Sequence, residues 1–205
     1  MEKKSNREKI LKLVEGAVMV ALAFGLSWVT KFIPFLNLPW GGSITLFSML
    51  PIVVYSIRNG VKCGLMCSFV YSLTQLAQGI VDGLFGWGLA PAMLVGCIFL
   101  DYTGAFTVLG FAGMFRKKDM KGWISGTVVV IFIRYAFHVL SGAVIFASAG
   151  KLWEGLGEIT DPWLYSMAYN ACYMLPEMIL TAIGAVLLFK TGAVKMILKK
   201  QESKA

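Results

Sequence analysis

Apolar residues occur along the chain in six runs, which short polar, proline-containing or glycine-rich stretches separate. A helix that crosses the hydrocarbon core of a bilayer needs about 17–25 predominantly apolar residues. Most of the runs reach this length, and the second and third are the shortest. The pattern therefore predicts an all-α integral membrane protein with six transmembrane helices, at about residues 11–32, 44–57, 62–78, 91–115, 120–147 and 162–189.

The composition agrees with this pattern, since 58% of the 205 residues are hydrophobic and only 15% are charged. Soluble domains carry about 25% charged residues. Water-soluble, disordered and disulfide-scaffold classes are therefore excluded. We expect one membrane domain over residues 1–205, with basic tails at residues 1–10 and 191–205.

The formal net charge of +8 has a topological meaning, because 16 of the 19 Lys and Arg residues fall in four clusters on one side of the six-helix arrangement. Cytoplasmic loops of membrane proteins carry such an excess. We therefore expect both termini to be cytoplasmic, with attraction to anionic lipid and no nucleic-acid partner. The clusters lie at residues 3–12, 58–62, 116–121 and 190–204.

Motifs for several chemistries are missing from the sequence. It has no G-x-x-x-x-G-K-[ST] phosphate loop, no H-E-x-x-H and no G-x-S-x-G, so we expect neither ATP hydrolysis by this chain nor another enzyme activity. The four cysteines lie inside predicted helices without metal or redox spacing. No cofactor or metal is expected.

Ionisable side chains inside the predicted helices are few: Glu15, Asp101, Arg134, His138 and Glu177. Each costs roughly 2.5–3.5 kcal/mol on insertion scales and so needs a reason to be there. At 1.5 Å per residue, Asp101 and His138 lie about 15 and 16 Å from the outer ends of their helices, and Asn170 lies about 12 Å down. Similar depths on three helices indicate a small-molecule cavity that opens outward.

Structural explanations compete with this one. Asp101 and Arg134 could pair simply to neutralise each other, and His138 could make an ordinary interhelical hydrogen bond. Glu177 could be a structural partner, a contact to another subunit or a ligand. Glu15, near the inner interface, is expected to extend its carboxylate towards the headgroups.

Four segments, in this order along the chain, resemble one family. The stretches GAVMVALAFGLS, FLDYTGAFTVLGFAGMF, RYAFHVLSG and YSMAYN are similar to those of the thiamine-specific substrate-binding (S) component of energy-coupling factor (ECF) transporters. The resemblance implies a protein of the bacterial plasma membrane that captures extracellular thiamine. It also implies docking on a transmembrane coupling subunit served by two ATPase subunits.

The resemblance implies roles for particular residues. Asp101 and Tyr102 match an acidic–Tyr pair that grips the aminopyrimidine ring, and His138, four residues after Arg134, matches an imidazole near the ligand, with Gly142 leaving room. Tyr165 and Asn170 match a Tyr-x4-Asn pair. Ala17 and Ala21 match an A-x-x-x-A docking motif, and small residues at this spacing let helices approach closely in lipid.

Two positions depart from the family pattern. Phe146 stands where a stacking Trp is usual, and the acid at position 101 is the shorter Asp. Trp40 or Trp153 could supply the aromatic wall instead, and the loop 35–43 could close over the ligand. An S component for another small vitamin or a thiamine precursor therefore remains an alternative, as does an intramembrane enzyme that uses His138 with Asp101 or Glu177.

Overall fold

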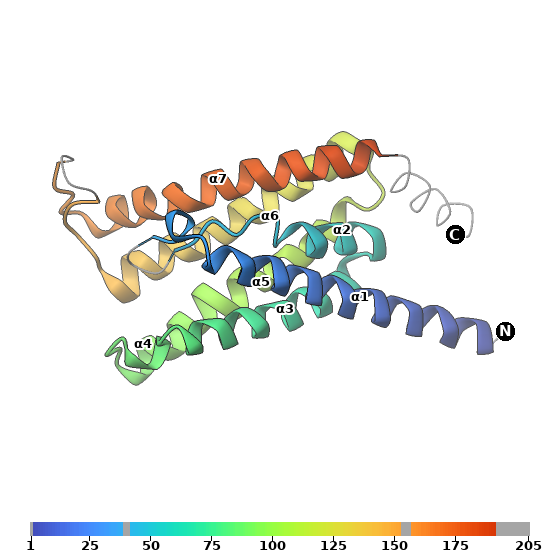
Figure 1. The fold of residues 1–205 in the computed structure, drawn as a ribbon, viewed down its shortest axis with the longest axis horizontal. Coiled ribbons are helices and arrows are strands. Elements are labelled where there is room, and N and C mark those ends of the chain that lie inside the picture. The colour runs from blue at the N-terminus through green and yellow to red at the C-terminus, as the bar shows by residue number, and fades with distance from the viewer. Residues whose placement is uncertain (1, 39–41, 153–156, 192–205) are drawn as a thin grey trace.

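The computed structural model is a bundle of long helices that run along one common direction (Figure 1). It describes residues 2–38, 42–152 and 157–191. Five helical stretches in this part of the chain are long and apolar enough to cross a membrane, which confirms the predicted fold class. In chain order they are α1 (Glu2–Lys31), α3 (Val61–Val81), the helix Pro91–Phe115, α6 (Met120–Ser141) with its continuation η5 (Gly142–Phe146), and α7 (Pro162–Lys190).

The second predicted helix begins later and is shorter than expected, whereas α1 begins nine residues before the predicted start and α3 ends three residues after the predicted end. The helical part of the second, α2, covers only Leu50–Asn59, instead of residues 44–57. Pro51 lies in the first turn of α2, where the missing N–H is tolerated. Before it, Phe47 has a φ of 58° and the Thr45 N–H donates to the Glu177 side chain, so residues 44–49 leave helical geometry. Ten residues rise only about 15 Å, too little to span the hydrocarbon core.

The helix Pro91–Phe115 is continuous but irregular. It begins as α4 (Pro91–Cys97), widens to a π-helical segment η3 (Ile98–Thr103), returns to α-helix in α5 (Gly104–Thr107) and tightens to 3-10 geometry in η4 (Val108–Phe115). In η4, a Cβ on Gly110 would lie 2.5 Å from the Leu65 backbone nitrogen of α3. Glycine is therefore needed there for the close approach of the two helices.

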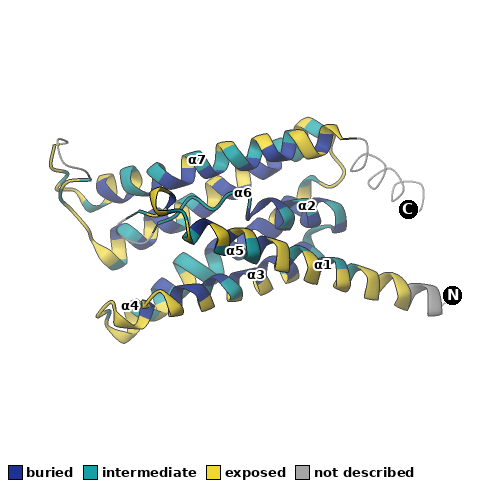
Figure 2. Cartoon of the chain, in the orientation of Figure 1, coloured by how far each residue is buried: buried dark blue, intermediate teal, exposed yellow. Residues whose placement is uncertain are grey.

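The core lies between α2, α3, α6, α7 and the helix Pro91–Phe115, and α1 packs on its outside (Figure 2). The α1 window that could cross a membrane is only 17% buried, against 33–44% for the other four. On the inner part of α1, Glu15 pairs with Arg58 of α2, with 2.5 Å between Oε1 and Nη1. The carboxylate that we expected to extend towards headgroups is thus an ion-pair partner.

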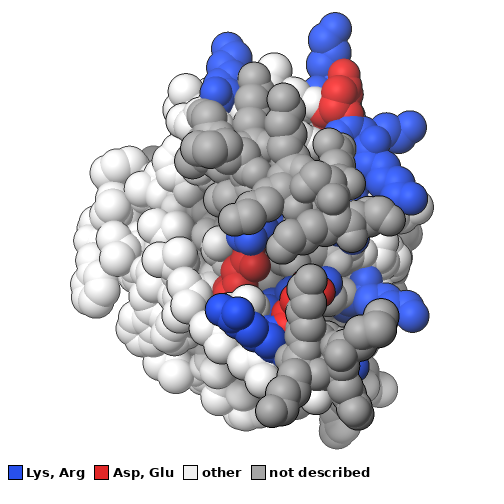
Figure 3. All heavy atoms as spheres, turned by 90° about the vertical axis from the view of Figure 1, so that its right-hand side faces the viewer, with Lys and Arg blue, Asp and Glu red and all other residues white. Residues whose placement is uncertain are grey.

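The start of α1 and the end of α7 lie at the same end of the bundle (Figure 1). Lys and Arg side chains gather on the face at this end (Figure 3). The opposite end carries α4, the short helix η2 (Leu84–Gly86) and the connection between α6 and α7. The described part of the chain therefore has the charge separation on which the expected topology depends; most of the C-terminal tail lies outside it.

Candidate substrate-binding site

Asp101 is the centre of a polar cluster between three helices. One carboxylate oxygen lies 2.9 Å from Nδ1 of His138, and the other accepts from the Ser141 hydroxyl at 2.5 Å and from the Cys97 thiol at 3.3 Å. The π-helical segment η3 sets its position: the Gly104 N–H bonds to the Phe99 carbonyl, five residues back. Such segments are frequent at functional sites.

His138 has one ring nitrogen without a partner. The side chain is 9% exposed, and its Nε2 is buried with no hydrogen-bond partner among the described residues. A neutral ring that donates from Nδ1 to the Asp101 carboxylate has Nε2 as an acceptor. Buried polar atoms without partners are uncommon in native proteins, and a ligand is one explanation for this nitrogen.

The face of α7 closes the cluster on the other side. Asn170 Nδ2 donates to the Ser166 carbonyl at 2.8 Å and to the His138 carbonyl at 3.4 Å, and Asn170 Oδ1 accepts from the Tyr173 hydroxyl at 2.5 Å. The Tyr173 ring stands edge-on to His138, with 6.1 Å between centroids. The amide is therefore held in one orientation next to the imidazole.

Gly142 lets α6 and α7 approach each other beside this cluster. A Cβ on Gly142 would overlap the Ser166 hydroxyl, and it would lie 3.5 Å from Nδ2 of Asn170. From the sequence we expected Gly142 to leave room for a ligand. The structure adds that Gly142 is also needed for the close packing of α6 and α7.

Arg134 does not pair with Asp101, which corrects the pairing considered from the sequence. Its Nη1 lies 2.9 Å from Glu177 Oε2 and 3.1 Å from the Met49 sulfur, and the guanidinium lies 4.1 Å from the Phe106 ring centroid. Arg134 is one turn deeper than His138, so it reaches α7 at Glu177 instead of the outer cluster. The Glu177 side chain, fully buried, is a structural partner here.

This pairing leaves a charge imbalance in the outer cluster. Arg134 and Glu177 neutralise each other, whereas the partners of Asp101 among the described residues are an imidazole, a hydroxyl and a thiol. With a neutral His138 the cluster carries one negative charge that is 18% exposed. A partly buried carboxylate in this state favours a cationic ligand, because a cation would compensate its charge.

The other predicted aromatic site residues make their described contacts with residues outside the Asp101 hydrogen bonds. Tyr102 points to α3, where its ring lies against Gly79. Tyr165 stacks on Tyr169, with 6.2 Å between centroids and an interplanar angle of 4°. Phe146 makes an edge contact with Trp87 at 5.9 Å.

Two further residues at the cluster, and a third beside Phe146, were not among the predicted ones. Ser166 and Tyr173 belong to α7 and continue the face that carries Asn170, and Trp87 comes from the connection after α3. The spacing of Tyr165, Tyr169 and Tyr173, four residues apart, is a signal that could have identified Tyr173. Trp40 and Trp153 lie outside the described residues, so Trp87 is the described indole beside Phe146.

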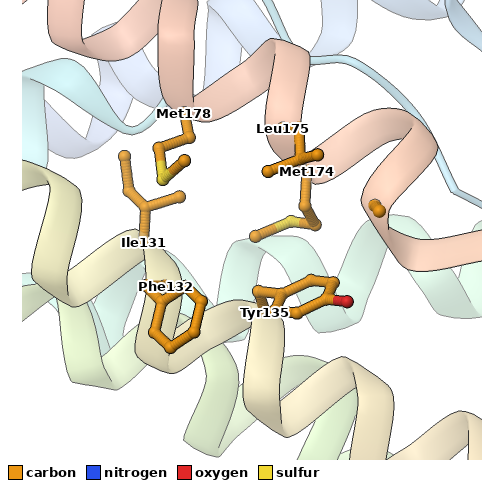
Figure 4. A pocket seen from close by; sticks show the side chains of 7 residues that line it. Ile131, Phe132, Tyr135, Met174, Leu175 and Met178 are labelled. Carbon is orange, nitrogen blue, oxygen red and sulfur yellow. The ribbon is translucent and has the colours of Figure 1, made fainter. Parts of the chain in front are cut away.

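A separate apolar pocket of about 220 Å³ lies between α6 and α7. Figure 4 shows Ile131, Phe132 and Tyr135 of α6 facing the methionine and leucine side chains of α7 across it. Apart from the Tyr135 hydroxyl, the described side chains that line it are apolar. It therefore fits apolar chains of the bilayer better than a polar vitamin.

Ala17 and Ala21 both lie exposed on α1. They are four residues apart, so they share one face of the helix. This face is free in the monomer, as a docking surface has to be.

Comparison with known proteins supports one family. The family model described as thiamine transporter protein (Thia_YuaJ) matches residues 13–197. The chain is 38% identical over 200 residues to the thiamine transporter ThiT of Bacillus subtilis (strain 168), covering 92% of this chain and 95% of that protein. A solved structure of ThiT from Listeria monocytogenes shares the fold, with a TM-score of 0.67, 21% identity and coverage of 93% of this chain and 98% of that one. The chain therefore belongs to the thiamine transporter protein family.

Proposed function

We propose that this protein is the thiamine-binding S component of an ECF transporter and that the Asp101 cluster is its binding site. The observation that carries the proposal is the Asp101 carboxylate beside the unpartnered His138 Nε2, in a chain of this family. Thiamine joins a permanently cationic thiazolium to an aminopyrimidine with hydrogen-bond donors and acceptors. Both halves have counterparts in the cluster.

The aminopyrimidine half meets the polar groups. An exocyclic amine can donate to the Asp101 carboxylate as a charge-assisted bond, or to the acceptor nitrogen of His138. The Asn170 amide, which Tyr173 holds in one orientation, would help to orient the aminopyrimidine ring. Ser141 keeps the Asp101 carboxylate in place from α6.

The cationic half meets aromatic rings. Tyr165, Tyr169 and Tyr173 lie on α7, and Phe146 at the end of η5 contacts Trp87 of the connection after α3. Aromatic faces attract cations by about 0.5–2 kcal/mol. Tyr102 and Gly142 then shape the site, the first against α3 and the second between α6 and α7.

Transport requires the loaded protein to dock on a partner subunit. We propose that the loaded protein, with both termini in the cytoplasm of the bacterial plasma membrane, docks its exposed α1 face at Ala17 and Ala21 on a transmembrane coupling subunit. Two ATPase subunits would supply the energy, because this sequence has no phosphate loop of its own. Close packing against small residues is a common way for helices to associate in lipid.

A titration of tryptophan fluorescence tests the proposal. Purified protein in lipid nanodiscs, titrated with thiamine, should show saturable quenching, and riboflavin and the separate pyrimidine and thiazole fragments should compete weakly. Tighter binding of another vitamin or of a fragment would overturn the substrate assignment. Product formation from thiamine by the isolated protein would instead support the intramembrane enzyme that uses His138 with Asp101.

A further inference from the structure

Glu177 is a buried acid that takes no direct part in the proposed binding site. Its carboxylate lies at the meeting point of α6, α7 and the non-helical residues 44–49. Besides the ion pair with Arg134, it accepts two hydrogen bonds from Thr45, one from the backbone N–H at 3.1 Å and one from the hydroxyl. One carboxylate thus fixes a segment that is 132 residues away in the sequence.

Thr45 is fixed from a second side. Its hydroxyl lies 2.6 Å from that of Ser48, which accepts from the hydroxyl of Tyr71 on α3 at 3.1 Å. The resulting chain of bonds crosses the bundle from Arg134 to Tyr71. Arg134, Glu177, Ser48 and Tyr71 are buried and Thr45 is partly buried, so these bonds form largely away from water, where hydrogen bonds are electrostatically stronger.

Three residues before Thr45, the chain touches the proposed binding site. A Cβ on Gly42 would lie 2.6 Å from the Tyr173 ring, so the Gly42 backbone packs directly on that ring. Tyr173 in turn donates to Asn170 and stands edge-on to His138. Tyr173 and Glu177 are four residues apart on α7, so one face of α7 holds both ends of the segment 42–45.

We propose that Glu177 is a positioning residue: by holding Thr45 it keeps Gly42 against Tyr173, and so fixes the Asn170 amide and the His138 ring for ligand binding. This inference rests on the proposed function for the ligand that is bound. The tether itself is independent of the ligand. Its loss should chiefly speed dissociation, because contacts formed after the encounter determine the off-rate.

Thr45→Val tests the tether, because it removes the hydroxyl without touching the Arg134–Glu177 pair. In nanodiscs we expect about tenfold faster dissociation of radiolabelled thiamine in a chase with unlabelled thiamine. Thr45→Ser keeps the hydroxyl and should restore the slow rate. Thr74→Val is the matched control, since the Thr74 hydroxyl bonds only within its own helix, to the Tyr71 carbonyl, and should leave the rate unchanged.

Gly42→Ala tests the other end of the same path. The added methyl should displace the Tyr173 ring and speed dissociation as much as Thr45→Val does. Because both changes break one coupled contact, the double variant should be no faster than either single variant. Multiplied effects of the two changes would show independent sites and overturn the path.

Hydrogen exchange of the ligand-free protein separates the tether from the ligand. Amides of residues 42–46 should exchange about tenfold faster in Thr45→Val than in the wild type or in Thr45→Ser. Wild-type rates in both the exchange and the chase experiment would overturn the inference. If the wild type bound no thiamine, the proposed function would fail, and the exchange measurement would still decide whether Glu177 holds the segment.

Discussion

The Asp101 carboxylate lies 2.9 Å from Nδ1 of His138, and this contact joins the π-helical segment η3 to α6 within the membrane-spanning part of the bundle. The acid is 37 residues before the imidazole and reaches it because the backbone widens at residues 98–103. The contact leaves Nε2 of His138 as the unpartnered nitrogen. The Asp101 carboxylate and the free acceptor nitrogen of His138 are thereby neighbours in one cluster.

Asp101→Asn should weaken thiamine binding. The change removes the negative charge that compensates the cation and one charge-assisted acceptor, a loss of about 1–3 kcal/mol. At tenfold for each 1.4 kcal/mol, the Kd should rise about 5- to 150-fold in the fluorescence titration. Asp82→Asn, which affects a half-exposed partner of Lys31, is the control. Wild-type affinity in a folded Asp101→Asn protein would remove this residue from the site.

Ala17→Trp should abolish thiamine uptake by cells and leave binding by the purified protein intact. A bulky ring on the exposed face of α1 would block helix approach without entering the binding site. Ala136→Trp places the same side chain on the exposed side of α6 and should not affect uptake. Loss of binding together with uptake, or uptake at the wild-type rate, would contradict the docking role.

Arg134→Met should destabilise the protein strongly, because it leaves the buried Glu177 carboxylate without its ion-pair partner. Breaking such a pair costs about 3–5 kcal/mol, whereas replacing both partners by apolar residues is often nearly neutral. The thermal midpoint in detergent should therefore fall in Arg134→Met and recover in part in the double variant with Glu177→Leu, which removes the unpaired charge but also the acceptor of two Thr45 hydrogen bonds. A double variant that is as unstable as the single one would show that the pair is not the cause.

Gly142→Ala should loosen the contact between α6 and α7, because the added methyl overlaps the Ser166 hydroxyl. Overpacking of this kind costs about 1–3 kcal/mol. Removing that hydroxyl as well, with Ser166→Ala, should return part of the lost thermal stability. Gly25→Ala, where a Cβ meets nothing within 4 Å, should be neutral or stabilising. Equal effects of the two glycine substitutions would argue against the close contact.

The sequence was sufficient to locate the five long helices, and for some of them it also gave the bounds. The predicted bounds 91–115 and 162–189 differ from the observed Pro91–Phe115 and Pro162–Lys190 by one residue at most. Apolar length is a local property, and the free energy of placing a helix in hydrocarbon follows from it. Residues 44–49 were wrongly predicted as helix. Their apolar composition does not show that the Thr45 N–H donates to Glu177, a residue far along the chain.

The sequence predicted which residues belong to the site better than it predicted which of them contact one another. The scarcity of charge in the membrane-spanning segments identified Asp101, Arg134, His138 and Glu177, since each charge there is costly. It could not say which acid meets which base. Asp101 and Glu177 lie at different depths, and the π-helical segment turns the first towards His138 while the rise of α6 places Arg134 beside the second.

The sequence by itself thus determined the membrane class, the helix positions and the small set of buried polar groups, because each follows from composition along a short stretch of chain. The tertiary structure alone decided the two acid–base pairs, the partner of Gly142 and the hold of Glu177 on Thr45. These contacts join residues 24 to 132 positions apart. They depend on how the helices rotate and approach one another, which no local pattern records.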